Sequence, residues 1–251
     1  GPKIKLATDS KLAAIQRKNA VERIARLQSK GVIVQEYTHQ PLLWAGSKFS
    51  LRAFAVIASV NPLIVLYRDG PASRSPLKYR ADDFSDKLSH MPNVHREGFN
   101  WNMRRPPLQK LQQYLDTNFK SKKGYVDKTL RPSMQAIMAD VVRSLVRQRG
   151  DRHYWPLPGT MKILCFDFLL DKNFKLYFHE TNSNCVVFPG YPHLKGPVQE
   201  QTQQAITVDS LLFAEELLYR KKYGLSLKPT SFFRWKELKQ LFDILIDEAK
   251  K

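Results

Sequence analysis

Apolar and polar residues follow helical and strand-like patterns along the chain. Residues 9–30 carry apolar side chains at close to helical spacing, with Gly31 placed after them. This stretch is therefore predicted to form an amphipathic helix. Residues 32–37 follow with a high density of β-branched side chains, which predicts a buried strand and a layered arrangement of helices and strands. Glu36 lies where that strand is expected to end.

Residues 48–60 and 63–70 are apolar on both faces and are separated by Asn61 and Pro62. Such runs are typical of central rather than edge strands. The Asn-Pro step predicts the turn that joins them.

Polar side chains flank these two strands. Lys48, Ser50 and Arg52 alternate in the first strand, so they are expected to share one of its faces. A three-residue loop would place Arg52 and Arg68 on the same face and a two-residue loop on opposite faces, and we expect the three-residue loop. The pattern fits both an anion clamp and ordinary charged strand ends, and it leaves the two open.

Residues 166–184 read as two strands of bulky, β-favouring residues joined by a short polar turn. If the loop holds two or four residues, Phe178 lies opposite Asp167. Asp167, Glu180 and Asn182 then project from one face. A slip of one residue would move Asp167 to the other face.

Asp167, Glu180 and Asn182 together supply two carboxylates and an amide oxygen. Hard oxygen ligands without Cys or His favour Mg²⁺ over zinc. The same spacing is equally typical of a charged rim on an edge hairpin, so the residues alone leave both interpretations open.

Three further stretches show helical periodicity, namely residues 134–148, 198–223 and 232–249. The first is predicted to pack on the sheet, and the second to end in a basic turn before Gly224. The third is predicted to be a terminal amphipathic helix that docks on its own domain. Residues 73–125 are rich in Pro, Arg, Lys and Asn, and they predict a long surface insertion that either binds a partner or is simply solvated.

The composition is that of a folded, strongly basic protein. The 251 residues include 43% hydrophobic residues, enough for a sizeable core in one domain or two small ones. Lys and Arg number 41 against 23 Asp and Glu, which gives a formal net charge of +18. Because such a surplus attracts polyanions, acidic polypeptide tails, RNA, nucleotides and anionic membranes are all candidate partners.

Cys165 and Cys185 are the two cysteines of the chain and make no disulfide framework. A reducing compartment is therefore expected, and no bridge between them is predicted. The longest apolar run, residues 51–67, contains Arg52 and the Asn-Pro break, which excludes it as a membrane span. The first residues show no signal-peptide pattern, which favours a cytoplasmic location without excluding an organellar assembly.

Five motifs, in order along the chain, resemble those of the tubulin–tyrosine ligase-like enzymes, which are members of the ATP-grasp superfamily. The motifs read VQEY, KFSLR, YRDG, FDF and ETN and lie at residues 34–37, 48–52, 67–70, 166–168 and 180–182. Five ordered motifs are far more specific than any one of them. The resemblance favours the metal-site interpretation of the hairpin over the charged rim.

The resemblance implies an α/β fold of ATP-grasp type, with a mostly antiparallel central sheet flanked by helices and the amino-terminal part absent. Residues 1–47 are then expected to be a remnant of the central subdomain, and residues 48–225 the carboxy-terminal ATP-grasp domain with a basic insertion at about 73–125. Residues 226–251 hold the expected terminal amphipathic helix.

Individual residues acquire roles from the resemblance. Gln35 and Glu36 would lie at the adenine hinge, and Lys48 near the nucleotide phosphates. Arg52 and Arg68 would face the substrates as catalytic residues, with Arg68 able to hold an amino-acid carboxylate by two parallel bonds.

The remaining implied roles concern the metal and the reaction. Asp167, Glu180 and Asn182 would bind magnesium. The implied activity uses ATP to convert a carboxylate into an acyl phosphate, which an amino group then attacks to form a peptide or isopeptide bond. An acidic tubulin tail or another acidic polypeptide suits the basic surface as the partner, and implies a cytoplasmic or microtubule-associated protein.

Some positions depart from the family pattern. The family has an acid where Ser50 stands and a threonine where Pro92 stands. Its lysine-bearing glycine loop is expected before residue 1, so the chain is expected to carry about half of an ATP site. Either it is a fragment of an active ligase, or it is a catalytically inactive relative that serves as a basic structural or RNA-associated subunit of a large assembly such as a ribonucleoprotein.

Overall fold

The computed structural model describes residues 35–38, 40–92, 105–147, 160–183, 185 and 197–250. The helix predicted at residues 9–30 and the first part of the strand predicted at residues 32–37 lie outside these ranges. The backbone of residues 35–38 is irregular, so the prediction of strand structure there is wrong.

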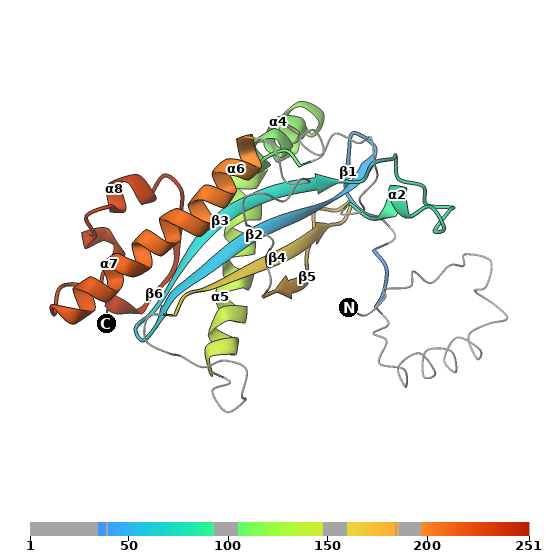
Figure 1. Cartoon of the computed structure of the whole chain (residues 1–251). Coiled ribbons are helices and arrows are strands. Elements are labelled where there is room, and N and C mark those ends of the chain that lie inside the picture. Colours follow the sequence, from blue (N-terminus) through green and yellow to red (C-terminus); the bar gives the residue numbers. More distant parts are fainter. Residues whose placement is uncertain are drawn as a thin grey trace, which may run out of the picture.

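Six strands form one antiparallel sheet in the order β5-β4-β2-β3-β6, with a short β1 paired to β2 (Figure 1). The strands are β1 Leu43–Trp44, β2 Ser47–Val60, β3 Leu63–Arg74, β4 Lys162–Leu170, β5 Leu176–Asn182 and β6 Asp243–Asp247. The two long strands β2 and β3 lie in the interior of the sheet, as their apolar pattern predicts. The predicted fold class, a mostly antiparallel sheet flanked by helices, is confirmed.

Helices cover both faces of the sheet (Figure 1). One face, named the α5 face here, carries α4 Leu108–Asn118, the π-helical turn η2 Val126–Leu130 and α5 Arg131–Arg147. The other, the α7 face, carries α6 Pro197–Gln204, η3 Ala205–Asp209, α7 Ser210–Lys222 and α8 Trp235–Leu238. The short helices that complete the described ranges are α2 Lys87–His90, η1 Lys120–Lys122, η4 Pro229–Ser231 and η5 Glu248–Lys250.

Alternation along the strands builds a core on each face. Tyr67 and Phe166 point to the α5 face, where they share a cluster with Met134 of α5. Val56 points to the α7 face and shares a cluster with Phe213 of α7. Each such buried side chain contributes about 1.5–3 kcal/mol, so burial rather than helix propensity holds these helices on the sheet. The helices predicted at residues 134–148 and 198–223 are confirmed.

The turn between β2 and β3 corrects one step of the prediction. Val60 pairs with Leu63, so the loop holds two residues, and the prediction of a three-residue loop is wrong. The register then shifts by one between Ile57 and Ser59, because Ala58 is an extra residue in β2. This bulge restores the predicted outcome, because Phe54 pairs with Arg68 and therefore Arg52 and Arg68 share the α7 face.

The hairpin of β4 and β5 shows the same kind of compensation. Leu170 pairs with Leu176, so the loop holds residues 171–175 and is longer than predicted. Phe178 lies opposite Phe168 rather than opposite Asp167, and the register then shifts by one residue. Asp167 consequently lies opposite Glu180, and the two carboxylates share the α7 face as predicted.

The terminal amphipathic helix predicted for residues 232–249 is wrong. Helix α8 there spans four residues, and β6 is an edge strand that pairs with β3 from Ile64 to Tyr67. The outer edge of β3 presents backbone donors and acceptors that require partners, and pairing with them outweighs the helical periodicity of the segment. Docking on its own domain is confirmed, because Leu238 and Phe242 are buried in the α7-face core.

The long surface insertion predicted at residues 73–125 is only partly correct. Residues 93–104 lie outside the described ranges. Helix α4 within this stretch buries Leu108, Leu111 and Leu115 completely in the α5-face core. The basic and proline-rich composition therefore concealed a helix with one apolar stripe.

Cys165 and Cys185 are joined by a disulfide, with their Cα atoms 5.8 Å apart, so the prediction of no bridge is wrong. Cys165 pairs with Asn182 in the β4–β5 ladder. Cys185 comes three residues after Asn182, lies against Cys165 of β4 and is 7% exposed. A lone pair of cysteines 20 residues apart carries no framework signal, so spacing alone did not indicate it. None of the helices in the described ranges is long and apolar enough to cross a membrane.

Candidate active site

Arg52 and Asp167 form the centre of the candidate site, on the α7 face. They are direct neighbours in the β2–β4 ladder. The Arg52 guanidinium donates two hydrogen bonds to the carboxylate, from Nε to Oδ1 at 2.8 Å and from Nη2 to Oδ2 at 2.7 Å. Because Asp167 is only 4% exposed, a two-point cationic partner offsets much of the cost of burying its charge.

Glu180 and Asn182 extend the site across β5. Asn182 Nδ2 donates to Glu180 Oε1 at 3.1 Å and to Asp167 Oδ2 at 3.4 Å. Glu180 is exposed and Asn182 is half-buried. The predicted convergence of these three side chains on one face is therefore confirmed, while their role stays a prediction.

The donor set of the cluster suits Mg²⁺. Two carboxylates and an amide oxygen are hard ligands, and Asp167 Oδ1 keeps a lone pair beyond the one that Arg52 uses, whereas Oδ2 accepts from both Arg52 and Asn182. Within the described ranges, no three His, Cys, Asp or Glu side chains gather in a way that could hold a metal ion. The cluster has two acids, and Asn182 would have to supply the third oxygen.

The charges of the cluster leave one carboxylate without a bonded cation. Burial lowers the pKa of Arg52, but the hydrogen bonds and charge of Asp167, with a contribution from Glu180, outweigh it and raise the pKa. Arg52 is therefore a permanent cation bonded to Asp167. Glu180 forms no ion pair with any residue the structure describes. The exposed side of the cluster thus favours a cation.

Lys48 lies in a different environment on the same strand. It is 5% exposed, and its Nζ donates to the Tyr37 hydroxyl at 3.0 Å and lies 4.1 Å from the centre of the Tyr37 ring. The Tyr37 hydroxyl in turn is 2.6 Å from Nδ1 of His90. Burial lowers the pKa of Lys48 to about 8. Sequence reasoning missed this Lys48–Tyr37–His90 group, although His90 lies two residues before Pro92, a position compared with the family.

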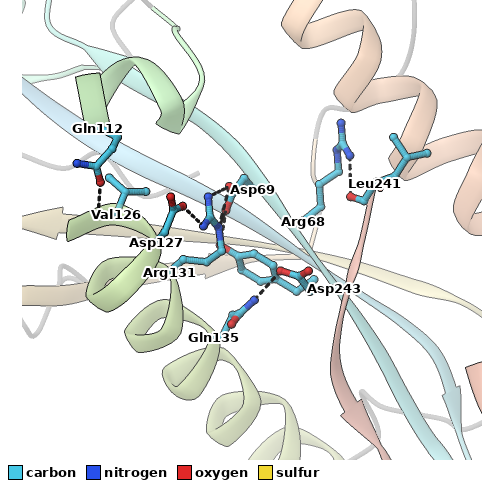
Figure 2. A network of polar contacts seen from close by, with 10 residues as sticks. Arg68, Asp69, Gln112, Val126, Asp127, Arg131, Gln135, Leu241 and Asp243 are labelled. Atoms are coloured by element: carbon cyan, nitrogen blue, oxygen red, sulfur yellow. Dashed lines mark hydrogen bonds and ion pairs between the residues drawn. The ribbon is translucent and has the colours of Figure 1, made fainter. Parts of the chain in front are cut away.

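Arg68 turns toward the C-terminal segment (Figure 2). Its Nη1 donates to the Leu241 carbonyl at 2.7 Å. Burial lowers the pKa of Arg68, and the charges of Asp69 and Asp209 oppose that shift. The structure therefore brings Arg68 to the same face as Arg52 but bonds it to the residues before β6, not to the carboxylate cluster. Its predicted contact with a substrate stays a prediction.

Asp69, next to Arg68, is anchored on the α5 face (Figure 2). Arg131 of α5 donates from Nη2 to Asp69 Oδ2 at 2.7 Å and from Nε to Oδ1 at 3.2 Å, and the Tyr67 hydroxyl donates to Oδ1 at 2.6 Å. Burial lowers the pKa of Arg131, but the hydrogen bonds and charge of Asp69 and the hydrogen bond of Asp127 raise it by more. The net shift of the pKa is therefore upward. This network ties β3 to α5 beside Arg68, a role that sequence reasoning missed.

Gly70 allows β3 to lie unusually close to β2 beside the site. A Cβ atom at Gly70 would lie 2.6 Å from the Arg52 carbonyl oxygen and 2.9 Å from the Phe54 ring. The YRDG motif thus combines an anchor, Asp69, with a close approach of backbone at Gly70. The motif itself was the available signal for both residues.

Gln35 and Glu36 are both exposed on irregular backbone, so their placement at an adenine hinge stays a prediction. Ser50 is half-buried opposite Ser73 on β3, and a hydroxyl there adds no charge to the face. Pro92 is half-buried shortly after α2.

Comparison with known proteins gives one family and several relatives. The family model described as "Tubulin-tyrosine ligase family" matches residues 4–208. The chain is 27% identical over 212 residues to "Protein polyglycylase TTLL10" of Macaca fascicularis, covering 78% of this chain and 32% of that protein. It is 26% identical over 211 residues to "Inactive polyglycylase TTLL10" of Homo sapiens, covering 78% and 29%.

A second group of relatives is represented by "Probable tubulin polyglutamylase ttll-9" of Caenorhabditis elegans, which is 29% identical over 167 residues, covering 61% of this chain and 36% of that protein. The chain spans about a third of the length of these curated relatives. The family match includes every candidate site residue from Gln35 to Asn182.

Proposed function

The chain belongs to the tubulin-tyrosine ligase family, and from this premise we propose that it is part of an ATP-dependent carboxylate–amine ligase that adds an amino acid to an acidic protein tail. The observation that supports the proposal most directly is the cluster of Asp167, Glu180 and Asn182 on one face, with Arg52 bonded to Asp167. A tubulin tail is the proposed acceptor, because relatives are named tubulin polyglutamylases. This acceptor would place the protein in the cytoplasm or on microtubules.

Asp167, Glu180 and Asn182 would hold Mg²⁺ through their side-chain oxygens. The ion, when bound, would neutralise charge on the nucleotide phosphates during phosphoryl transfer. Asp167 suits this role because Arg52 fixes its plane by two bonds. Asn182 would join this site after a half-turn of its amide, because Nδ2 rather than Oδ1 faces the two carboxylates in the structure.

Arg52 has a second function in this proposal. Its two bonds to Asp167 use Nε and Nη2, so Nη1 is the part of the guanidinium that can meet a substrate carboxylate. The side chain is 29% exposed. A cation fixed in this way orients an anionic group without losing side-chain freedom again when the substrate binds.

Lys48 is proposed to lie near the phosphates, where the ammonium group is needed in its charged form. Burial lowers the pKa of Lys48 to about 8, so the ammonium form still predominates at neutral pH. The Tyr37 hydroxyl and His90 hold its Nζ in place.

The alternative of an RNA-associated subunit finds no support among the relatives, and we do not propose it. Ser50 stands where the family pattern has an acid, so the proposed metal site relies on the hairpin oxygens more than in that pattern. The reaction proposed is the formation of an acyl phosphate from a carboxylate and ATP, followed by attack of an amine on the acyl carbon with loss of phosphate.

A labelled-amino-acid assay tests this proposal. Full-length protein is incubated with tubulin, ATP and Mg²⁺ and with radiolabelled glycine, glutamate or tyrosine in turn. Incorporation that needs ATP and is lost in Asp167→Asn/Glu180→Gln supports the ligase. The matched control is Glu215→Gln, which changes an exposed acid on α7. Absence of ATP-dependent incorporation of all three amino acids, in a protein that is folded, would contradict the proposal for this reaction.

A further inference from the structure

Six lysines lie on two segments that meet at the loop of the β4–β5 hairpin. Four come from η1 and the residues after it, and two come from the hairpin loop. They are Lys120, Lys122, Lys123, Lys128, Lys172 and Lys175, called the lysine cluster below. Lys122 is half-buried and the other five are exposed.

Aromatic contacts hold the two segments of the lysine cluster together. The Tyr125 hydroxyl donates to the Phe174 carbonyl at 2.9 Å. The rings of Phe119 and Phe174 meet edge to face, with centroids 5.4 Å apart. Lys122 Nζ lies 4.5 Å from the centre of the Phe174 ring. The lysines are thus presented on a packed base, although the two segments are about fifty residues apart in sequence.

The lysines of the cluster form no ion pair within the described part of the chain. Every ion pair found there has an arginine as its cation. The nearby acids already have other partners. Asp127 pairs with Arg131, Asp116 accepts the Gly124 amide at 3.0 Å, and Asp171 accepts the amides of its own loop. The surface is therefore available to an external anion.

The chemistry of the lysine cluster favours carboxylates over nucleic acid. Lysine ammonium groups are point charges that bind carboxylates and phosphates alike, whereas single-stranded nucleic acid is commonly bound by exposed rings on which its bases stack. The rings here are not free for stacking, since Tyr125 is 8% exposed, Phe174 is half-buried, and Lys175 Nζ lies 4.9 Å from the centre of the exposed Tyr177 ring. We propose that the lysine cluster is a docking surface for an acidic polypeptide segment, distinct from the candidate active site.

On the premise of the proposed ligase function, docking at the lysine cluster would bring an acidic tail close to the candidate active site. Lys175 directly precedes β5 and Glu180 lies within it, five residues later, which corresponds to about 16 Å along the strand. An extended acidic stretch of about five residues spans that distance. A tail held at the lysine cluster would therefore keep another of its residues close to the carboxylate cluster and raise its local concentration there.

Binding of poly-L-glutamate in the absence of ATP tests the docking surface separately from ligation. The variant is Lys120→Gln/Lys123→Gln/Lys128→Gln/Lys172→Gln, which leaves the Lys122–Phe174 contact intact. The control is Lys222→Gln/Lys228→Gln/Lys236→Gln/Lys239→Gln, four exposed lysines at the α7–α8 end with the same loss of charge. Circular dichroism checks that both fold.

The cluster variant is expected to bind fluorescent poly-L-glutamate about tenfold more weakly than wild type at 0.1 M salt, and the control less than twofold. Equal losses in the two variants would overturn the proposal, because net charge alone would then explain binding. Polyuridylate serves as the comparison polyanion, and a loss as large as that for poly-L-glutamate would overturn the choice of an acidic polypeptide. A protein that shows the expected losses but no ligation would keep the docking surface and lose the proposed function.

Discussion

Asp167 and Glu180 lie directly opposite each other in the β4–β5 ladder, and one extra residue, His179, allows this while Phe178 remains opposite Phe168. The bulge places the ring of Phe178 against Phe166 and Phe168 on the α5 face. The carboxylate two residues later is then on the α7 face. The bulge at His179 therefore allows Phe178 to pack in the core and Glu180 to join the carboxylate cluster.

Deletions on the two sides of Glu180 should therefore differ. Removing His179 removes the bulge but still leaves Glu180 next in line opposite Asp167, so the cluster is retained. Removing Thr181 moves Asn182 to the other face and divides the cluster. Titration with Mn²⁺ followed by electron paramagnetic resonance, with Mn²⁺ as a stand-in for Mg²⁺, should show affinity within about threefold of wild type for the first deletion and at least about tenfold weaker for the second. Equal losses would contradict the register argument.

The Arg52–Asp167 pair should show strong coupling in a double-mutant cycle. Arg52→Gln leaves a nearly buried carboxylate unpaired, and Asp167→Asn leaves a guanidinium unpaired. Because Arg52 is 29% exposed, each single change is expected to cost about 2 kcal/mol, less than a fully buried pair would lose. The double variant should lose about 1–2 kcal/mol less than the sum. Urea unfolding measures all four proteins, and additive losses would mean that the pair does not stabilise the fold.

Gly70→Ala should be destabilising for a reason other than glycine entropy. The added methyl carbon would meet the Arg52 carbonyl oxygen, which is backbone and has little room to move. A loss of about 2–3 kcal/mol is expected. At Gly224, whose φ is +63° and where no atom lies within 4 Å of the added carbon, the same change should cost only about 1 kcal/mol. Similar losses at both positions would show that the close approach of β2 and β3 is unimportant.

Lys48 should make stability depend on pH in a defined window. Its pKa is lowered by burial from 10.5 to about 8 in the folded state. Below pH 8 both the folded and the unfolded states hold the proton, and the burial cost is constant. Between about pH 8 and 10.5 the unfolded state binds a proton that the folded state does not, so stability from this group rises with pH.

Comparison with Lys48→Met isolates that contribution. The difference in free energy of unfolding between wild type and variant should shift in favour of wild type by at most about 3 kcal/mol from pH 8 to 10.5. Tyr37 also contributes near the top of this window, because its ordinary pKa of 10.0 applies in the unfolded state and burial raises it in the folded state. That contribution is common to wild type and variant and cancels in the difference. Chemical denaturation at several pH values measures the shift, and a constant difference would show that Lys48 is not buried as described.

The sequence pattern predicted the long strands and the convergence of Asp167, Glu180 and Asn182 correctly. Both loop lengths were nonetheless predicted incorrectly, and the bulges at Ala58 and His179 corrected their effects. A bulge is set by packing across several strands and leaves little mark on the local sequence.

The failures at the C-terminus and at the cysteines have a related cause. Residues 243–247 contain the β-branched Ile244 and Ile246 and so also suit a strand, and pairing with the free edge of β3 decides their structure. The Cys165–Cys185 bridge likewise depends on where the chain returns after β5. Local propensity cannot report a partner that only the folded sheet provides.

Calorimetric titration of the full-length protein with Mg²⁺-ATP tests the central claim most directly. Wild type is compared with Asp167→Asn/Glu180→Gln and with the exposed-acid control Glu215→Gln. The account predicts saturable binding by wild type and by the control, and affinity at least about tenfold weaker in the double variant. Absence of binding by folded wild type, or equal binding by all three proteins, would contradict a role of the carboxylate cluster in holding the metal and its nucleotide.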